Sequence, residues 1–146
     1  MKAPYRQMRM RQLSHSLAPF ERAKGVTRPS RGWLRAIREA LGIPGEQIGQ
    51  TIGATKQGIQ WFERSEAEDR ITLRNLRRVA EAMGCELVYA IVPKSGSLQD
   101  LAESRVRAEA TKRVLSVEHT MALEGQAPGG VKELIDEKTK QITKKL

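Results

Sequence analysis

The stretch from Gly45 to Glu63, GEQIGQTIGATKQGIQWFE, constrains the fold more than any other part of this chain. It predicts two short helices joined by a tight turn. Ile48 and Ile52 are four residues apart, and Ile59 and Phe62 are three apart, so each pair lies on one face of its helix. Each helix therefore has a face to bury and a face to expose.

A glycine and a threonine mark the turn between these helices. Gly53 stands where the first helix must stop, and glycine adopts the left-handed backbone of such a stop without steric cost. Thr55 follows as a good N-cap, because its hydroxyl accepts a backbone N–H two or three residues later. The second helix should run from Lys56 to about Arg64. This is the pattern of a helix-turn-helix, whose second helix enters the major groove of DNA.

The outer face of the second helix is polar, with one tryptophan. Lysine suits the acceptors of guanine, glutamine suits adenine, and tryptophan can contact a thymine methyl group. The alternative is an ordinary helical hairpin without a role in DNA binding. We predict DNA-binding residues at Thr55, Lys56, Gln57, Gln60, Trp61 and Arg64.

The segment from Gly53 to Glu63 resembles the recognition segment of the XRE-type family of phage repressors, and the resemblance extends from roughly Trp33 to Met83. It implies a compact helical bundle that binds operator DNA. Glycines lower helix propensity by up to about 1 kcal/mol each relative to alanine, so packing must hold these helices. The departures from the family are Gly45 for a phosphate-contacting glutamine, Gly49 for alanine, Gly58 for serine and Trp61 for a polar base-reading residue.

The charge of the chain favours a polyanionic partner and is uneven. The 146 residues carry a formal net charge of +9. Residues 1–31 hold eight Lys/Arg against one acid, residues 32–93 hold eight of each, and residues 94–146 hold ten against eight. The basic excess therefore belongs to the N-terminal segment and not to the helix-turn-helix.

The basic N-terminal segment, residues 1–31, combines an arm or helix with a linker. Residues 2–17 have either of two interpretations: a solvated basic helix packed on the repressor domain, or an arm whose Arg6, Arg9 and Arg11 contact DNA phosphates or a minor groove. Ala18 to Ser30 contains two prolines and a glycine and is expected to be the linker.

Residues 32–84 form the predicted DNA-binding domain, and the fold class is mainly α. Gly32 to Leu41 is its first helix, with an apolar stripe at spacings of three and four. Ser65 to Arg70 is expected to be a polar loop. Thr72 caps a last helix from Leu73 to Met83, whose stripe is Leu73, Leu76, Val79, Ala80 and Met83.

Residues 85–93 contain the one predicted strand. Glu86 to Val92, ELVYAIV, is rich in β-branched and aromatic residues and is stopped by Pro93. A lone strand cannot satisfy its backbone groups, so we expect it to pair with the same strand of a second copy in a homodimer. The alternative is an extended segment covered by the C-terminal helices.

Residues 94–146 are a helical extension. Ser97 caps a long helix that ends around Glu124 and Gly125, and a short charged helix follows over Val131 to Lys145. A single cysteine, Cys85, allows no disulfide within the chain, and the two histidines are too far apart in sequence to suggest a metal site. No apolar run is long enough for a membrane span, and we expect no cofactor. We expect a cytoplasmic, nucleoid-associated protein that is not an enzyme.

The long helix ends in a second motif. Thr120 to Gly125, TMALEG, resembles the inhibitory motif of antitoxins that silence Fic-domain enzymes, which transfer AMP to a protein hydroxyl. The resemblance implies that Glu124 pairs with a Fic arginine and denies it the γ-phosphate of ATP, with Thr120 and Gly125 completing the motif. An arginine fork grips a carboxylate or a phosphate in the same bidentate way.

The whole chain resembles the mobile mystery protein A family, in RGWLRAIREALG, ITLRNLRRVAEAMGCELVYAIVP and HTMALEGQ, in this order. That family is associated with a neighbouring Fic-domain protein, mobile mystery protein B. The resemblance implies an antitoxin that also represses its own operon. The alternative is a plain dimeric repressor without a toxin partner.

Overall fold

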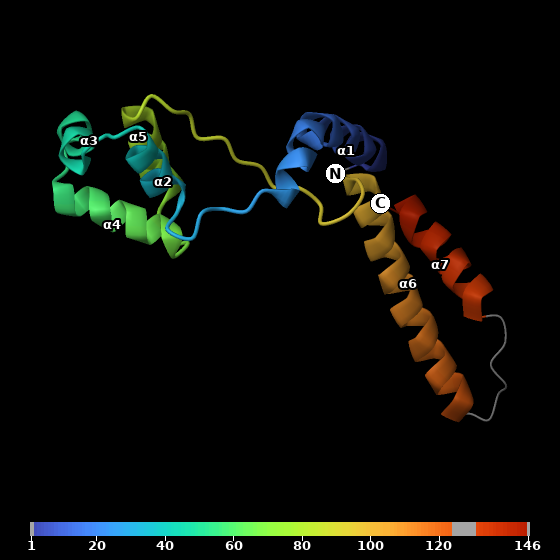
Figure 1. Cartoon of the computed structure of the whole chain (residues 1–146). Helices are drawn as coiled ribbons and strands as arrows, with labels where there is room; N and C mark the ends of the chain where they lie inside the picture. The colour runs from blue at the N-terminus through green and yellow to red at the C-terminus, as the bar shows by residue number, and fades with distance from the viewer. Residues whose placement is uncertain (1, 124–130, 146) are drawn as a thin grey trace. The chain divides into compact units, whose positions relative to one another are not determined.

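The computed structural model describes residues 2–123 and 131–145 and is mainly helical (Figure 1). The described residues form seven α-helices and one 3-10 helix. They are α1 (Ala3–Leu17), the 3-10 helix η1 (Ala18–Gly25), α2 (Trp33–Ala40), α3 (Gly45–Ile52), α4 (Lys56–Ala67), α5 (Leu73–Ala82), α6 (Leu98–Leu123) and α7 (Val131–Lys145).

The chain divides into two compact units. Residues 22–90 contain α2 to α5 and are called the helix-turn-helix unit. Residues 1–21 and 91–146 contain α1, α6 and α7 and are called the hairpin unit. The helix-turn-helix unit is therefore an insertion in the sequence of the hairpin unit, so the N-terminal segment and the C-terminal extension belong together.

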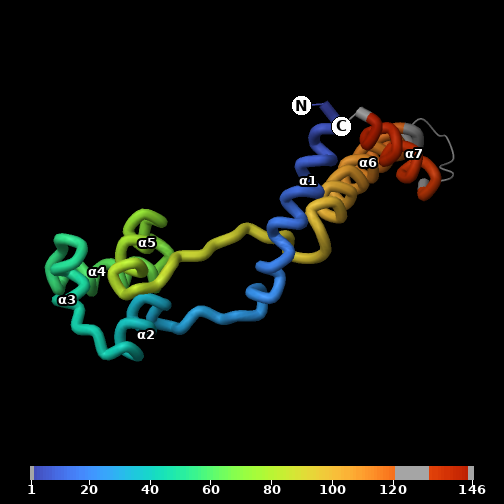
Figure 2. The backbone as a smooth tube through the Cα atoms, turned by 90° about the horizontal axis from the view of Figure 1, so that it is seen from above, coloured from blue at the N-terminus to red at the C-terminus, as the bar shows by residue number. Residues whose placement is uncertain are grey.

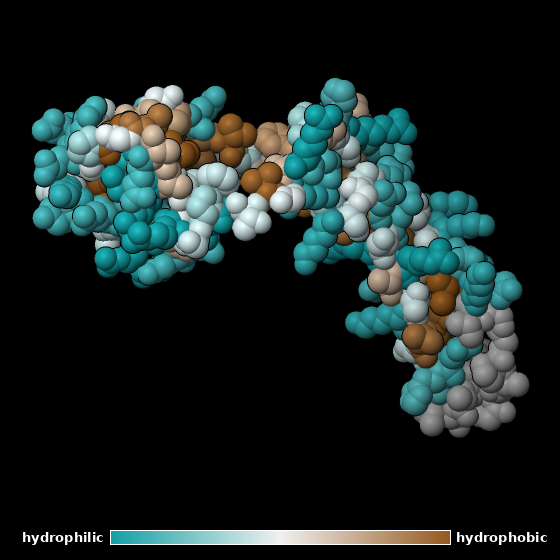
Figure 3. Space-filling model, in the orientation of Figure 1, coloured by the Kyte–Doolittle hydropathy of each residue, from teal (hydrophilic) through white to brown (hydrophobic). Residues whose placement is uncertain are grey.

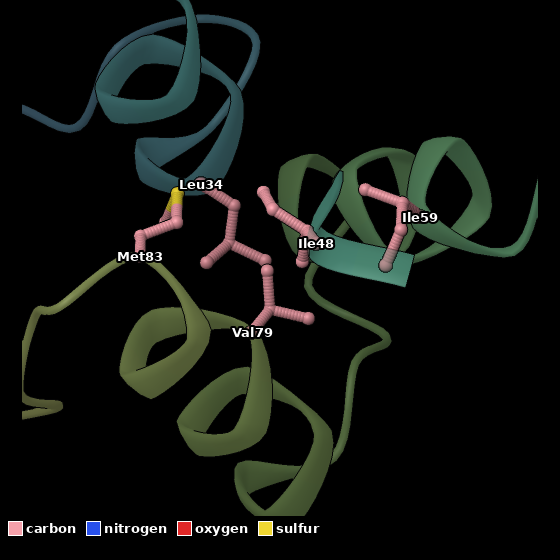
Figure 4. Close-up of a cluster of buried hydrophobic side chains, with 5 residues drawn as sticks. All are labelled: Leu34, Ile48, Ile59, Val79 and Met83. Atoms are coloured by element: carbon pink, nitrogen blue, oxygen red, sulfur yellow. The ribbon is translucent and has the colours of Figure 1, made fainter. Parts of the chain in front are cut away.

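One aliphatic cluster holds α2 to α5 together, and Figure 4 shows its side chains converging from all four helices. Its members are Leu34, Ile48, Ile59, Val79 and Met83, the last at the end of α5. Ile59 and Val79 are fully buried at 0% exposure. Since each fully buried aliphatic side chain contributes about 1.5–3 kcal/mol, this cluster can offset the weak propensity of the short, glycine-containing helices.

The helix α4 is about one turn longer than the sequence predicts. Residues 65–67 are helical, and Ser65 and Glu66 are buried, so a polar loop beginning at Ser65 is wrong for these residues. The Glu66 carboxylate accepts hydrogen bonds from the backbone N–H groups of Trp33 (3.0 Å) and Leu34 (2.7 Å). The last turn of α4 thus caps the start of α2, where Gly32 has no side chain to do so.

The segment predicted as a linker, Ala18 to Ser30, is partly structured. Its first part is η1, with Pro19 in the first turn, where a missing N–H costs little. Its second part is anchored by Arg28, which donates to the carbonyls of Glu66 (2.9 Å) and Ala67 (3.1 Å) at the end of α4. An arginine that serves as a helix C-cap explains why this stretch is not a free linker.

No strand occurs in residues 2–123 or 131–145, so the strand predicted for Glu86 to Val92 is wrong for the single chain. A strand needs a neighbouring strand for its backbone groups, and the described chain offers none. Val88, Tyr89 and Ile91 are 63, 59 and 86% exposed, and Figure 3 shows hydrophobic residues at the surface here. The alternative, a segment covered by the C-terminal helices, stays a prediction, because those helices belong to the other unit.

The hairpin unit consists of α6 and α7 side by side, with α1 packed on α6 (Figures 1 and 2). Buried Val106, Ala110 and Val114 form its apolar seam. A hydrogen-bonded ion pair of 2.7 Å between Arg107 and Asp136 joins α6 to α7.

The predicted cap, Ser97, forms a capping box with Asp100 at the start of α6. The Ser97 hydroxyl accepts from the Asp100 N–H (3.1 Å), while the Asp100 carboxylate accepts from the Ser97 N–H (2.8 Å). The bond from the Ser97 backbone, followed by that from its hydroxyl, lowers the pKa of Asp100. Because that pKa is depressed, the cap is present above the ordinary pKa of aspartate and is lost as pH falls through the lower value in the folded state.

Candidate nucleic-acid interface

The turn between α3 and α4 closes on two glycines. Gly53 has φ +74° and ψ +34°, the left-handed conformation expected at this position. The Ala54 N–H donates to the Gly49 carbonyl at 2.8 Å. A Cβ added at Gly49 would lie 2.3 Å from the Ala54 oxygen, so the turn passes too close to α3 for any side chain there. The angle between the two helices therefore depends on glycine at position 49.

Contacts on both sides of the turn fix the start of α4. The Thr55 hydroxyl accepts the Gly58 N–H at 3.0 Å, as predicted for its N-cap. Ile59 is fully buried in the core cluster. Arg78 of α5 donates to the Ile52 carbonyl at 2.7 Å and so caps the end of α3. These contacts fix the position of α4 before any partner binds.

The predicted reading face of α4 is exposed. Trp61 is 56% exposed and meets the ring of Phe62 edge-on, with 5.6 Å between ring centroids, so its orientation is restrained by the core behind it. The structure brings together on this helix the exposed side chains of Lys56, Gln57, Gln60, Trp61 and Arg64, with Thr55 at its cap.

Behind this face lies a buried ion pair. Glu63 of α4 is 5% exposed and accepts two hydrogen bonds from Arg38 of α2, through Nε and Nη2. The third donor of Arg38, Nη1, reaches the Ile43 carbonyl at 3.2 Å. The hydrogen bond to Glu63 raises the pKa of Arg38, so the guanidinium stays charged. The ion pair links α4 to α2 with fixed geometry, because two nitrogens of the Arg38 guanidinium bind the two carboxylate oxygens of Glu63.

A row of arginines beside α4 was not predicted from the sequence. Arg31, Arg35 and Arg38 follow one another at spacings of four and three, so they share one side of α2 and of the turn before it. Together with Arg64 of α4 they line a cleft of about 460 Å³. Their spacing was the signal that could have identified them, but the apolar stripe of the same helix was the stronger pattern.

The three arginines of the predicted arm lie on α1, in the hairpin unit, and not in the unit that carries the reading face. Arg6 is half-buried and lines a small cavity of about 110 Å³ with Met10 and Val106, while Arg9 and Arg11 are exposed. The structure shows α1 packed on α6, within the hairpin unit, and packing on the repressor domain stays a prediction. Contact between these arginines and phosphate stays a prediction.

The second motif is described only in part, since Thr120 to Leu123 form the end of α6. Thr120 is exposed in the last part of α6, and its hydroxyl donates to the Ser116 carbonyl at 3.1 Å. Glu124 and Gly125 lie outside the described residues.

Within residues 2–123 and 131–145, no helix is long and apolar enough to cross a membrane, and no three His, Cys, Asp or Glu side chains lie together as a metal site would need. No protein-family model, curated protein or solved structure matches this chain. The assignment of a function therefore depends on the geometry of the two units and on the motifs of the sequence.

Proposed function

We propose that the chain is a DNA-binding transcription repressor that reads its operator with α4. One observation supports this most directly: five exposed side chains, most of them able to form hydrogen bonds, project from α4. The N-cap, the core cluster and the buried ion pair hold this helix in place. A positioned helix with polar side chains near its start is what reading of base edges in a major groove requires. The chain has no proposed catalytic role.

Gln57 offers the sharpest test of base reading. Operator sequences would first be selected from a randomised duplex pool with the intact protein. Gln57→Ala should then cost about 1–3 kcal/mol on the selected operator and little on random DNA, because a bidentate contact to adenine is lost. Fluorescence anisotropy with both duplexes measures the difference.

Gln50→Ala is the matched control, since Gln50 is exposed on α3 and off the reading face. It should leave both affinities unchanged. Equal losses for Gln57→Ala on operator and random DNA would remove Gln57 from base reading.

We further propose that the repressor acts as a homodimer, because two copies would place two recognition helices on a palindromic operator. The open segment of residues 86–92 supports this: its apolar side chains are exposed and its backbone groups have no ladder partner within the described chain. Val88→Pro removes a backbone donor from such a pairing and should shift the protein from dimer to monomer in sedimentation equilibrium. A folded Val88→Pro protein that stays dimeric would place the interface elsewhere.

The second proposed activity is inhibition of a Fic-domain AMP-transferase, and it rests on the resemblance of Thr120 to Gly125 to the inhibitory motif. The described part of α6 is compatible with a partner at this end, since Leu115 and Val117 are 53 and 51% exposed although α6 carries a buried apolar seam elsewhere. In this proposal Glu124 competes with the ATP γ-phosphate for an arginine of the partner. The surrounding helix supplies the contact area.

Replacement of Glu124 should separate inhibition from binding. Glu124→Gly is expected to leave the complex with the neighbouring Fic protein intact while AMP transfer from labelled ATP returns in the co-purified complex. Glu133→Gly, at an exposed glutamate in the first turn of α7, is the control and should leave the complex silent. A silent Glu124→Gly complex would favour the plain dimeric repressor.

A further inference from the structure

The cleft between α2 and α4 contains more positive charge than its own carboxylates neutralise. Its lining includes Arg31, Arg35, Arg38 and Arg64 but a single acid, Glu63. With the nearby Glu39 that pairs with Arg35 counted as well, four arginines face two carboxylates, which leaves +2. An exposed concave site with such an excess attracts an anion.

Both carboxylates are already hydrogen-bonded to an arginine, so the excess positive charge lies on the two remaining arginines. Glu63 uses both oxygens on Arg38, and Glu39 accepts from Arg35 Nε at 2.7 Å. The guanidinium groups of Arg31 and Arg64 form no hydrogen bond or ion pair with any residue in 2–123 or 131–145. Two free arginine forks therefore open into the same cleft.

The chemistry of these forks selects the ligand. Guanidinium groups bind phosphate oxygens in a bidentate manner, and Gln60, also in the cleft, adds an amide donor. Gln60 and Arg64 are one turn apart on the exposed face of α4, on the flank beside Gln57, whose contact with bases is proposed above. When a helix occupies the major groove, the groups on its flank meet the sugar-phosphate backbone that borders the groove.

We propose that Arg31 and Arg64, with Gln60, bind a backbone phosphate of the DNA strand beside the recognition helix. The inference rests on the proposed DNA binding and identifies the source of its salt dependence. Arg38 is a positioning residue, because it occupies Glu63 and thereby leaves the other two arginines without a carboxylate. Phosphate binding is thus built into the helix-turn-helix unit.

The test measures the binding of the intact protein to a random-sequence duplex over a range of KCl concentrations. Each phosphate contact contributes about 0.9 to the slope of log K against log salt. The double variant Arg31→Gln with Arg64→Gln should lower that slope by about one. The ratio of operator to random affinity should stay the same, because the lost contact carries no sequence information. Neither side chain forms a hydrogen bond or an ion pair within residues 2–123 or 131–145, although the charge of Arg31 helps to lower the pKa of Glu39. Circular dichroism verifies that the variant folds.

Arg70→Gln is the matched control, since it removes one exposed charge of the same unit, from an arginine paired with Glu68 outside the cleft lining. It should preserve the wild-type slope. A double variant with the wild-type slope would overturn the proposal. A second outcome would also overturn it: inorganic phosphate raises the melting temperature of the wild type but not of the double variant, while the double variant keeps the wild-type slope. The cleft would then bind a free anion and not DNA. A wild-type protein that binds no duplex would instead refute the proposed function itself.

Discussion

Three glycines within ten residues of the helix-turn-helix have different physical roles. Gly53 supplies a left-handed backbone, but nothing lies within 4 Å of the Cβ that another residue would add. Gly49 has an ordinary helical backbone, yet a Cβ there would meet a backbone oxygen. At Gly58 an added Cβ would approach the Thr55 hydroxyl at 3.3 Å, a side-chain atom that can adjust. Glycine is thus required at Gly49 and optional at Gly58.

Alanine substitutions should therefore have opposite effects at these two positions. Gly49→Ala forces the turn away from α3 and should reduce the free energy of unfolding by about 1–3 kcal/mol, as overpacking does. Gly58→Ala should be neutral or stabilising by up to about 1 kcal/mol, because alanine has the higher helix propensity. The midpoints of urea unfolding at an unchanged m value measure both. Equal stability of the two variants would contradict the tight approach of Ala54 to Gly49.

At the scale of elements, the sequence predicted the helices whose apolar residues recur at three and four, because that spacing is local information. The ends of those helices were less predictable. Leu41 and Leu73 continue the predicted stripes of α2 and α5, yet they are 55 and 47% exposed, because each lies at an end of its helix. Periodicity identifies a face of a helix but not how far the neighbouring helices cover it.

The last turn of α4 was missed because its cause lies in another part of the chain. Ser65 and Glu66 are polar and follow the apolar stripe, so local reasoning places them in a loop. They are buried because Glu66 caps α2 and because Arg28 caps α4. The absence of a capping side chain at Gly32 was the available hint: buried backbone donors need an acceptor from somewhere.

The candidate site shows the same division between local and non-local information. Thr55 and the exposed residues of α4 follow from helix geometry, and the structure places them as predicted. The arginine cleft depends on how α2 lies against α4, and on Arg38 occupying the one carboxylate in its lining. A count of charges by segment separates the members of the cleft, because Arg31 belongs to the basic residues 1–31 and the others to residues 32–93, which sum to zero. Neutrality of a segment does not mean neutrality of each surface.

At the scale of the whole molecule, the insertion of one unit within the sequence of the other changes how function can be divided. The basic N-terminal helix α1 packs with α6, so a division into an N-terminal DNA-binding half and a C-terminal antitoxin half does not follow the compact units. The core cluster, the capping bonds of Arg28 and Glu66, and the ion pair of Arg38 with Glu63 lie entirely within residues 22–90. The helix-turn-helix unit therefore contains the interactions that it needs to fold.

The fragment of residues 22–90 should accordingly unfold cooperatively, with the same midpoint as that unit in the intact chain. The two tryptophans, Trp33 and Trp61, both lie in this unit, so their fluorescence reports its unfolding alone, whereas far-ultraviolet circular dichroism also reports α1, α6 and α7.

Deletion of residues 1–21 removes the helix packed on α6. It should leave the fluorescence midpoint in urea unchanged and shift the remaining circular dichroism transition to lower urea. A fluorescence midpoint that falls in the 22–90 fragment, or in the deletion variant, would show that the helix-turn-helix depends on the hairpin unit for its stability.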